Sequence, residues 1–429
     1  MKAVLFSLVA IFLLSFTSQA QLKGLMKKVQ NKVEQKVDQR IDKKVDTQID
    51  KTLDEIEGKN TAKTETSPPA TSTPSQPVNS GIKSYSKYDF VPGEKIIYSN
   101  DFSTDNMGEL PIGWNTNGNG VVAIFPTLKG NWAQFYQNSN YLTDNVDSFT
   151  QNFTIEFDLL IRRENPKAAF PQLAFGVLAS GDLPPSDNAL LKEYTTNFAV
   201  ELKIQPQDNN ASHMHLETYS EKKRYLNTDI KKIGSLQETF NKPIHIAFQV
   251  QKERLRIWFN EEKMYDLPKA ITAGALINQL YFVVKSYGGS DSEVGYAVSN
   301  IKIAKGLPDT RHKLVDEGKF STTGILFDIN ASTIKPESSG VLKEVADVLK
   351  KFTDIKVMIV GHTDSDGSDA ANLDLSKKRA EAVKQALVND FGIDASRISS
   401  DGKGEKEPIE DNKTKQGKAQ NRRVEFIKQ

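Results

Sequence analysis

The residues best suited to ligand chemistry lie in the last third of the 429-residue chain. Asp364 follows the apolar run 355–360, and Arg379 lies fifteen residues later in a helix-favouring segment. A carboxylate and a guanidinium that face each other can hold the ammonium and the carboxylate of one zwitterionic ligand. Considered singly, Asp364 is typical of a turn and Arg379 of a solvated helix face. Whether the two residues form a ligand site therefore depends on the helices and strands that position them.

Strand and helix patterns alternate through residues 313–429. One helix is expected to begin at Pro336, and a second spans 373–391. Asp364 then lies at the C-terminal end of a strand, and Arg379 lies on the second helix. The order of elements is expected to be β-α-β-α-β-β in an α+β domain. The expected strands are 320–327, 355–360, 397–402 and 423–427.

An ordered series of motifs surrounds the two residues. It consists of Gly361-His362-Thr363-Asp364, Gly367, Asn372, Arg379-Ala380, Gly402-Lys403-Gly404-Glu405 and Asn421-Arg422-Arg423-Val424. Over residues 313–429 this series resembles the OmpA C-terminal, peptidoglycan-associated domain family. The resemblance implies non-covalent binding of the diaminopimelate side chain of the peptidoglycan stem peptide, without a cofactor.

The resemblance also implies a role for individual residues. Asp364 corresponds to the acceptor of the ligand ammonium, and Arg379 corresponds to the clamp on the ligand carboxylate. For the run 421–423, a structural clamp on the last strand is an equal alternative, and Lys418 is expected outside the pocket. Further contacts with the ligand are implied for Thr363, Asn372, Asp328, Arg422 and Arg423.

Composition excludes several classes of protein. The chain has 56 Lys+Arg against 55 Asp+Glu, and residues 312–429 hold 20 of each kind, which argues against binding nucleic acid through bulk charge. Recognition must then come from a local acid–base pair. The absence of cysteine excludes disulfides, thiolate metal sites and a lipid-modified cysteine. The mean hydropathy of −0.48 excludes a polytopic helical membrane protein.

The N-terminal part divides into three segments of different composition. Residues 1–20 predict a secretory signal peptide, because Lys2 precedes a short apolar run that ends in small residues. Residues 21–58 predict a charged amphipathic helix with an apolar residue at every fourth position, which departs from the heptad of a coiled coil. This helix is interpreted as a spacer, or as an oligomerising or surface-docking helix. Residues 59–85 form a Ser/Thr/Pro-rich linker.

The middle segment, 86–307, predicts an all-β sandwich. Its apolar residues alternate with polar ones, as in 153–161 and 244–250. The opening 98–102, the hairpin 244–264 and a closing strand that starts at residue 296 resemble the laminin-G/concanavalin-like jelly rolls. The resemblance implies a ligand that is a carbohydrate or a protein.

A catalytic sandwich is the first alternative. Glu156-Phe157-Asp158 begins the E-x-D-x-E pattern of glycoside hydrolases of this fold, but Leu160 stands at the third position, so the general acid is missing. Glu156 and Asp158 are better interpreted as the solvent face of a half-buried strand. The second alternative is an integral outer-membrane β-barrel, which the charges in 252–259 and the lack of aromatic girdles disfavour.

Together these features predict a non-enzymatic protein of the bacterial envelope. After signal cleavage it is expected in the periplasm or at the outer membrane. Its C-terminal domain is expected to bind peptidoglycan and to tether the sandwich, while an association with the outer membrane stays open. No nucleic acid partner and no metal are expected.

Overall fold

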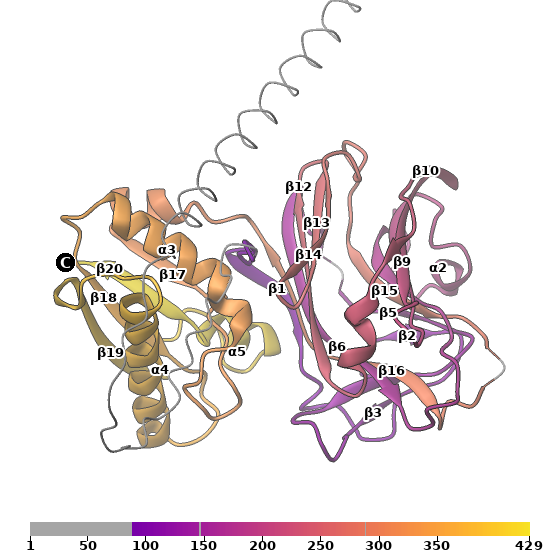
Figure 1. The fold of residues 1–429 in the computed structure, drawn as a ribbon, viewed down its shortest axis with the longest axis horizontal. Coiled ribbons are helices and arrows are strands. Elements are labelled where there is room, and N and C mark those ends of the chain that lie inside the picture. The colour runs from indigo at the N-terminus through magenta and orange to yellow at the C-terminus, as the bar shows by residue number, and fades with distance from the viewer. Residues whose placement is uncertain (1–87, 146, 288) are drawn as a thin grey trace, which may run out of the picture. The chain divides into compact units, whose positions relative to one another are not determined.

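The computed structural model describes residues 88–145, 147–287 and 289–429. The predictions of a signal peptide, a helix at 21–58 and a linker at 59–85 lie outside these residues. The described residues belong to one compact unit, in which a β-sandwich precedes an α+β domain (Figure 1). Within this part of the chain, no helix combines the length and apolar character needed to cross a bilayer.

The sandwich consists of two eight-stranded antiparallel sheets. The first has the order β14-β13-β12-β6-β16-β4-β3, with β1 also paired to β16, and the second has the order β10-β9-β8-β7-β15-β5-β2, with β11 also paired to β9. The strands of the first sheet are β1 (Lys95–Asn100), β3 (Gly120–Ala123), β4 (Trp132–Phe135), β6 (Asn152–Arg163), β12 (Pro243–Gln251), β13 (Arg254–Phe259), β14 (Glu262–Leu267) and β16 (Val294–Lys305). Those of the second are β2 (Asn115–Thr116), β5 (Ser139–Leu142), β7 (Leu173–Ala179), β8 (Phe198–Gln205), β9 (His213–Ser220), β10 (Lys223–Asn227), β11 (Lys231–Lys232) and β15 (Gln279–Val284).

The core of the sandwich lies between the two sheets. Alternate residues of β6, such as Phe157, are fully buried there, which confirms the period-2 pattern. The sequence analysis missed β7 because its run of seven apolar or small residues does not alternate. The second face of β7 is buried as well, since Ala174 and Leu178 pack against Leu190 of the short helix α2 (Asn188–Lys192).

The other face of β6 corrects an expectation. Glu156 and Asp158 were expected to face solvent, but only 4% and 8% of their surfaces are exposed. His245 of β12 lies between them, with Nδ1 3.0 Å from Asp158 and Nε2 3.4 Å from Glu156, while Lys302 Nζ lies 3.0 Å from Glu156. The expectation was wrong because residues 88–90 pack over this face of the sheet.

The α+β domain contains one four-stranded sheet, with the order β17-β20-β18-β19. Only β18 and β19 are parallel. Side chains of helices α3 and α4 form one apolar cluster with the sheet, and both helices lie on the same side of it (Figure 1). The elements are β17 (Lys319–Thr322), α3 (Ser339–Lys351), β18 (Val357–His362), α4 (Asp369–Asn389), β19 (Ile398–Gly404), α5 (Lys415–Asn421) and β20 (Val424–Lys428), and short helical turns are η1 (Gly234–Thr239), η2 (His312–Asp316), η3 (Pro336–Ser338) and η4 (Ala395–Arg397).

Two features of this domain differ from the prediction. The first strand ends at Thr322 instead of continuing to residue 327. The short helix α5 separates the last two strands, so the order of elements is β-α-β-α-β-α-β. This helix has seven mainly polar residues and no apolar period, and its first turn is fixed by the Thr414 hydroxyl, which accepts a hydrogen bond from the Gly417 N–H (2.9 Å).

Helix α5 is also held by the sandwich. Lys415 Nζ lies 2.7 Å from the fully buried carboxylate of Asp105, in the segment that follows β1, and 2.8 Å from the side chain of Asn100, the last residue of β1. The Gln420 side chain accepts a hydrogen bond from the Ile96 N–H (2.8 Å) and donates one to the Glu94 carbonyl (3.0 Å). The sandwich therefore fixes the helix that leads directly into Arg422.

Candidate functional site

The site begins where α4 crosses the ends of β18 and β19. Two glycines allow this approach: a Cβ at Gly361 would lie 2.3 Å from the Ser376 carbonyl oxygen, and a Cβ at Gly402 would lie 2.3 Å from the Lys377 nitrogen. The loop between β18 and α4 contains Asp364, and Arg379 follows this contact by one turn of the helix. The close packing explains why the two residues are brought to one region.

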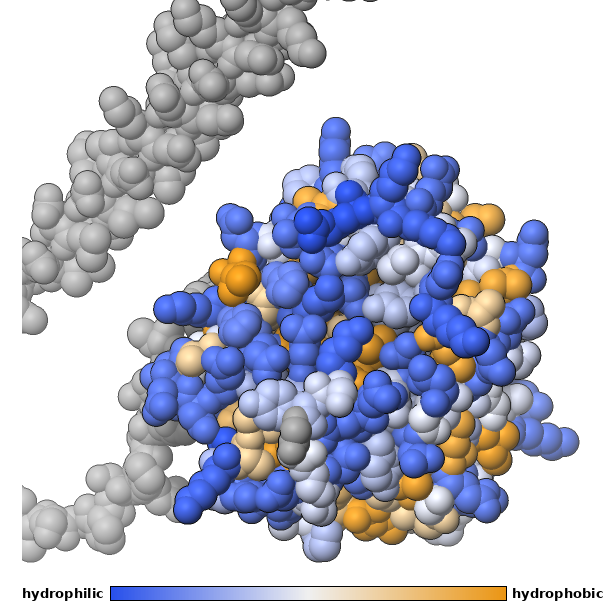
Figure 2. Space-filling view, turned by 90° about the vertical axis from the view of Figure 1, so that its right-hand side faces the viewer, coloured by the Kyte–Doolittle hydropathy of each residue, from blue (hydrophilic) through white to orange (hydrophobic). Residues whose placement is uncertain are grey.

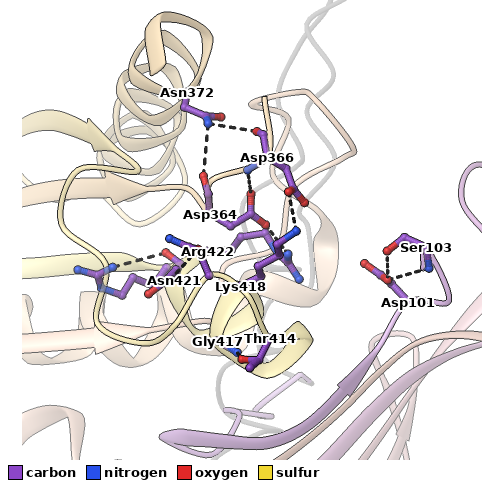
Figure 3. A network of polar contacts seen from close by, with 12 residues as sticks. Asp101, Ser103, Asp364, Asp366, Asn372, Thr414, Gly417, Lys418, Asn421 and Arg422 are labelled. Carbon is purple, nitrogen blue, oxygen red and sulfur yellow. Dashed lines mark hydrogen bonds and ion pairs between the residues drawn. The ribbon is translucent and has the colours of Figure 1, made fainter. Parts of the chain in front are cut away.

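Asp364 is nearly buried and already has a basic neighbour. Only 7% of its surface is exposed, and its Oδ2 lies 2.5 Å from Arg422 Nη1 at the end of α5 (Figure 3). Its Oδ1 accepts a hydrogen bond from the Asp366 N–H (3.2 Å). Lys418 Nζ lies 2.6 Å from the Asp366 carboxylate. Lys418 was expected outside the pocket, and the structure pairs it with Asp366, two residues after Asp364.

Arg379 presents a guanidinium held on one side only. Its Nε donates a hydrogen bond to the Ala331 carbonyl (3.0 Å), and its guanidinium carbon lies 4.9 Å from the centre of the Phe327 ring, a cation–π contact. Burial and the charge of Arg422 lower the pKa of Arg379, whereas Asp364 raises it. Among the described residues, Arg379 forms no ion pair within 4.0 Å. A ligand carboxylate would meet an arginine with free hydrogen-bond donors.

Thr363 lies in the loop between β18 and α4, and Asn372 lies in the first turn of α4, where it contacts that loop. The Asn372 amide donates to the backbone carbonyls of Asp364 (3.3 Å) and Asp366 (3.1 Å) and to the Glu405 carboxylate, so it shapes the loop. Thr363 is 4% exposed, and its hydroxyl has no hydrogen-bond partner within the described residues. An unsatisfied buried hydroxyl costs about 1–3 kcal/mol. A ligand atom that bonds to it would recover that cost.

The remaining two predicted residues differ in placement. Asp328 is exposed, and its backbone bonds to Thr333 and Ala331 close the loop that presents the Ala331 carbonyl to Arg379. Arg423 is buried: its Nε lies 2.9 Å from Glu425, and only 2% of its side chain is exposed. The structure therefore places Arg422 beside Asp364, whereas Arg423 is directed to Glu425 on the last strand.

Sequence reasoning missed three parts of this site. The Ala331 carbonyl gives no signal in the sequence, because any residue supplies a carbonyl. Glu405 lies within the recognised motifs and Lys418 was expected outside the pocket, and their partners Asn372 and Asp366 become apparent only when the loops are brought together.

The acids on which the catalytic alternative depended do not resemble a catalytic pair. Burial alone would raise the pKa of Glu156, but Lys302 and His245 lower it to about 2. A general acid needs a pKa raised towards neutrality. Within the described part of the chain, no group of three or more His, Asp or Glu side chains is arranged to hold a metal ion.

The fold and the candidate site together describe an α+β domain in which a buried carboxylate lies near a guanidinium that has no carboxylate partner within the described residues. Residues 326–422 match the model of the OmpA family. The chain is similar to outer membrane porin F of Pseudomonas aeruginosa (43% identity over 101 residues, 24% of this chain and 29% of that protein). It is also similar to the outer-membrane lipoprotein YfiB of the same species (37% identity, 28% of this chain and 73% of that protein).

Among solved structures, the peptidoglycan-associated lipoprotein from Burkholderia pseudomallei is 29% identical and matches 25% of this chain and 89% of that one, with a TM-score of 0.23. The chain belongs to the OmpA family through its C-terminal domain. It spans less than a third of the length of the porin F relative, so the likeness concerns this domain.

Proposed function

We propose that the C-terminal domain binds the free end of diaminopimelate in the peptidoglycan stem peptide. That end carries one ammonium and one carboxylate on the same carbon. Asp364 accepts the ammonium, and Arg379 holds the carboxylate through its free guanidinium edge. The observation that carries the proposal is the Arg379 guanidinium, which is fixed by Ala331 and Phe327 and lacks a carboxylate partner within the described residues.

The local charge balance supports the same ligand. The guanidiniums of Arg379 and Arg422 both act on the carboxylate of Asp364, but only Arg422 pairs with it, which leaves the guanidinium of Arg379 for a ligand carboxylate. The Asp364 carboxylate has acceptor capacity beyond its contact with Arg422, since two oxygens offer about four lone-pair sites. The ammonium therefore does not need to displace Arg422. The Thr363 hydroxyl supplies a further hydrogen bond.

The proposal is tested by sedimentation of the purified protein with peptidoglycan sacculi. Arg379→Ala removes charge-assisted hydrogen bonds of about 1.5–3 kcal/mol, so we expect binding to weaken roughly 10- to 100-fold. Asp364→Ala should weaken it similarly. Lys378→Ala is the matched control, because Lys378 is the neighbouring base on α4 and pairs only with the exposed Asp374 (2.7 Å). Undiminished binding by both site variants would refute the site.

For the whole chain, we propose a non-enzymatic envelope protein that tethers its β-sandwich to the cell wall. The names of its relatives, an outer membrane porin and an outer-membrane lipoprotein, support this location. The predicted signal peptide would deliver the protein to the periplasm, and residues 21–85 would give it reach towards the outer membrane or a partner. Retention of a tagged chain in the peptidoglycan fraction, lost with Arg379→Ala, tests the tether.

We also propose that the sandwich, assigned to residues 86–307, binds a glycan or a protein. The face seen in Figure 2 is mainly hydrophilic, with apolar side chains in small separate groups, which suits a polar ligand better than a large apolar partner. A glycan array with the Asp364→Ala, Arg379→Ala double variant tests this directly, because that variant removes the proposed wall site. Binding to no glycan would leave a protein ligand, to be sought by crosslinking in the envelope.

A further inference from the structure

A second concave site lies beside Arg379. A cavity of about 600 Å³ opens between the loop 332–336, the start of α3 and the C-terminal half of α4. Its volume falls within the range of small-molecule sites, roughly 300–1,000 Å³. None of the residues assigned to the diaminopimelate site lines it. It is therefore a separate feature that the proposed function does not use.

The cavity lies farther along α4 than Arg379. Ala382, Ala386 and Asn389 line it and lie three, seven and ten residues after Arg379, on the same face of the helix. With a rise of 1.5 Å per residue, the cavity extends from about 5 to about 15 Å beyond Arg379. Ser332 also lines it and directly follows the residue whose carbonyl holds Arg379.

The lining combines neutral hydrogen-bonding groups with small apolar surfaces. Ser339 is 2% exposed, and its hydroxyl has no hydrogen-bond partner within the described residues. The Gln385 amide nitrogen donates to Glu381 (2.7 Å), which leaves its carbonyl oxygen as a further acceptor. The charged lining residues carry both signs, so the cavity does not select a strongly charged ligand. Ser332, Thr333 and Asn389 add polar groups, and Ile334, Leu342, Ala382 and Ala386 add apolar ones.

We propose that this cavity binds an N-acetylated amino sugar of the same peptidoglycan fragment whose diaminopimelate end occupies Asp364 and Arg379. Such a sugar presents hydroxyls, one amide and one methyl group, which match the lining. The proposal rests on the proposed function. Diaminopimelate itself, two amino acids and a lactyl group separate the bound free end from the sugar, a reach of at most roughly 14 Å at about 3.3–3.6 Å per unit. This reach falls within the 5–15 Å span of the cavity.

The test is calorimetric titration of the mature chain with two probes. One is the diaminopimelate-containing tripeptide, and the other is the same peptide carrying its N-acetylated disaccharide. For the unmodified protein we expect the disaccharide to improve affinity at least fivefold. Ala382→Leu, which narrows the cavity at the end nearer Arg379, should remove that gain and leave the affinity for the peptide unchanged. Ala371→Leu is the matched control, because Ala371 is exposed on the first turn of α4 and does not line the cavity.

A second variant covers the case in which the larger side chain disturbs the fold. Gln385 is exposed, so Gln385→Ala should fold normally and reduce the gain from the disaccharide about twofold or more. The inference is overturned if the disaccharide adds nothing, or if these variants weaken both probes equally. Failure of the peptide alone to bind would instead refute the proposed function, so the two failures are distinguishable.

Discussion

Because of His245, the sandwich is expected to lose stability as the pH rises into the alkaline range. Its side chain is only 7% exposed and lies between the carboxylates of Asp158 and Glu156, at 3.0 and 3.4 Å. Burial would lower the pKa of His245, but the two carboxylates outweigh burial and raise the pKa from 6.5 to about 9. Lys302 pairs with Glu156 and Asn300 bonds Asp158, so both acids stay ionised. The protonated imidazole is therefore the form that the folded state favours.

The size of the effect follows from the shift. Because the folded-state pKa is raised, the stabilisation is fully present below about pH 6.5 and is lost as the pH rises through about 9. A shift from 6.5 to about 9 corresponds to about 3 kcal/mol, at 1.36 kcal/mol per pKa unit. This is a large fraction of a typical unfolding free energy of about 5–15 kcal/mol.

The assay is urea unfolding at several pH values from 6 to 9.5, followed by tryptophan fluorescence. The three tryptophans, Trp114, Trp132 and Trp258, are buried in the sandwich, so the signal reports on this domain. The unfolding free energy should fall by up to about 3 kcal/mol over this range. The variant His245→Gln should be less stable at pH 6 and should lose most of the pH dependence. Equal slopes for the two proteins would refute the reasoning.

Three further predictions follow from single contacts. Arg422→Ala should weaken binding to sacculi about threefold to tenfold, less than Arg379→Ala, and unchanged binding would remove Arg422 from the site. Burial would raise the pKa of Glu425, but its basic neighbours lower it to about 2, so the stability it supplies is present above about pH 4.5 and lost as the pH falls through about 2. Glu425→Gln should flatten acid unfolding, and an unaltered acid profile would contradict this. Lys415→Ala leaves the buried Asp105 carboxylate without its lysine, so the midpoint of thermal unfolding should fall by several degrees, and an unchanged midpoint would contradict the contact.

The sequence predicted most of the helices and strands, but fewer of the tertiary contacts that bury their outer faces. Alternation in β6 and the helical spacing in α3 and α4 are local patterns, and both were recovered because they reflect which face is buried. Strand β7 was missed because α2 buries its second face, and Glu156 was misplaced because residues 88–90 cover it. In each case, the cause is a contact with a segment distant in the sequence.

The candidate site likewise divides into residues that the sequence motifs indicate and groups that only tertiary contacts bring to the site. Asp364, Arg379 and Arg422 lie in motifs with family spacing, so their positions could be predicted. The carbonyl of Ala331 carries no side-chain signal. The sequence also does not indicate which of the two neighbouring arginines, Arg422 or Arg423, faces the pocket. That choice depends on the backbone at the end of α5, where Arg422 turns to Asp364 and Arg423 turns to Glu425.

The central claim concerns a zwitterion held between Asp364 and Arg379, and one comparison of ligands tests it most directly. Two stem peptides differ only at the third residue, which is diaminopimelate in one and lysine in the other. Both offer an ammonium for Asp364, but only diaminopimelate offers a carboxylate for Arg379. Calorimetric titration should give at least tenfold tighter binding of the diaminopimelate peptide, and Arg379→Ala should abolish this difference. Equal affinity for the two peptides would contradict the account.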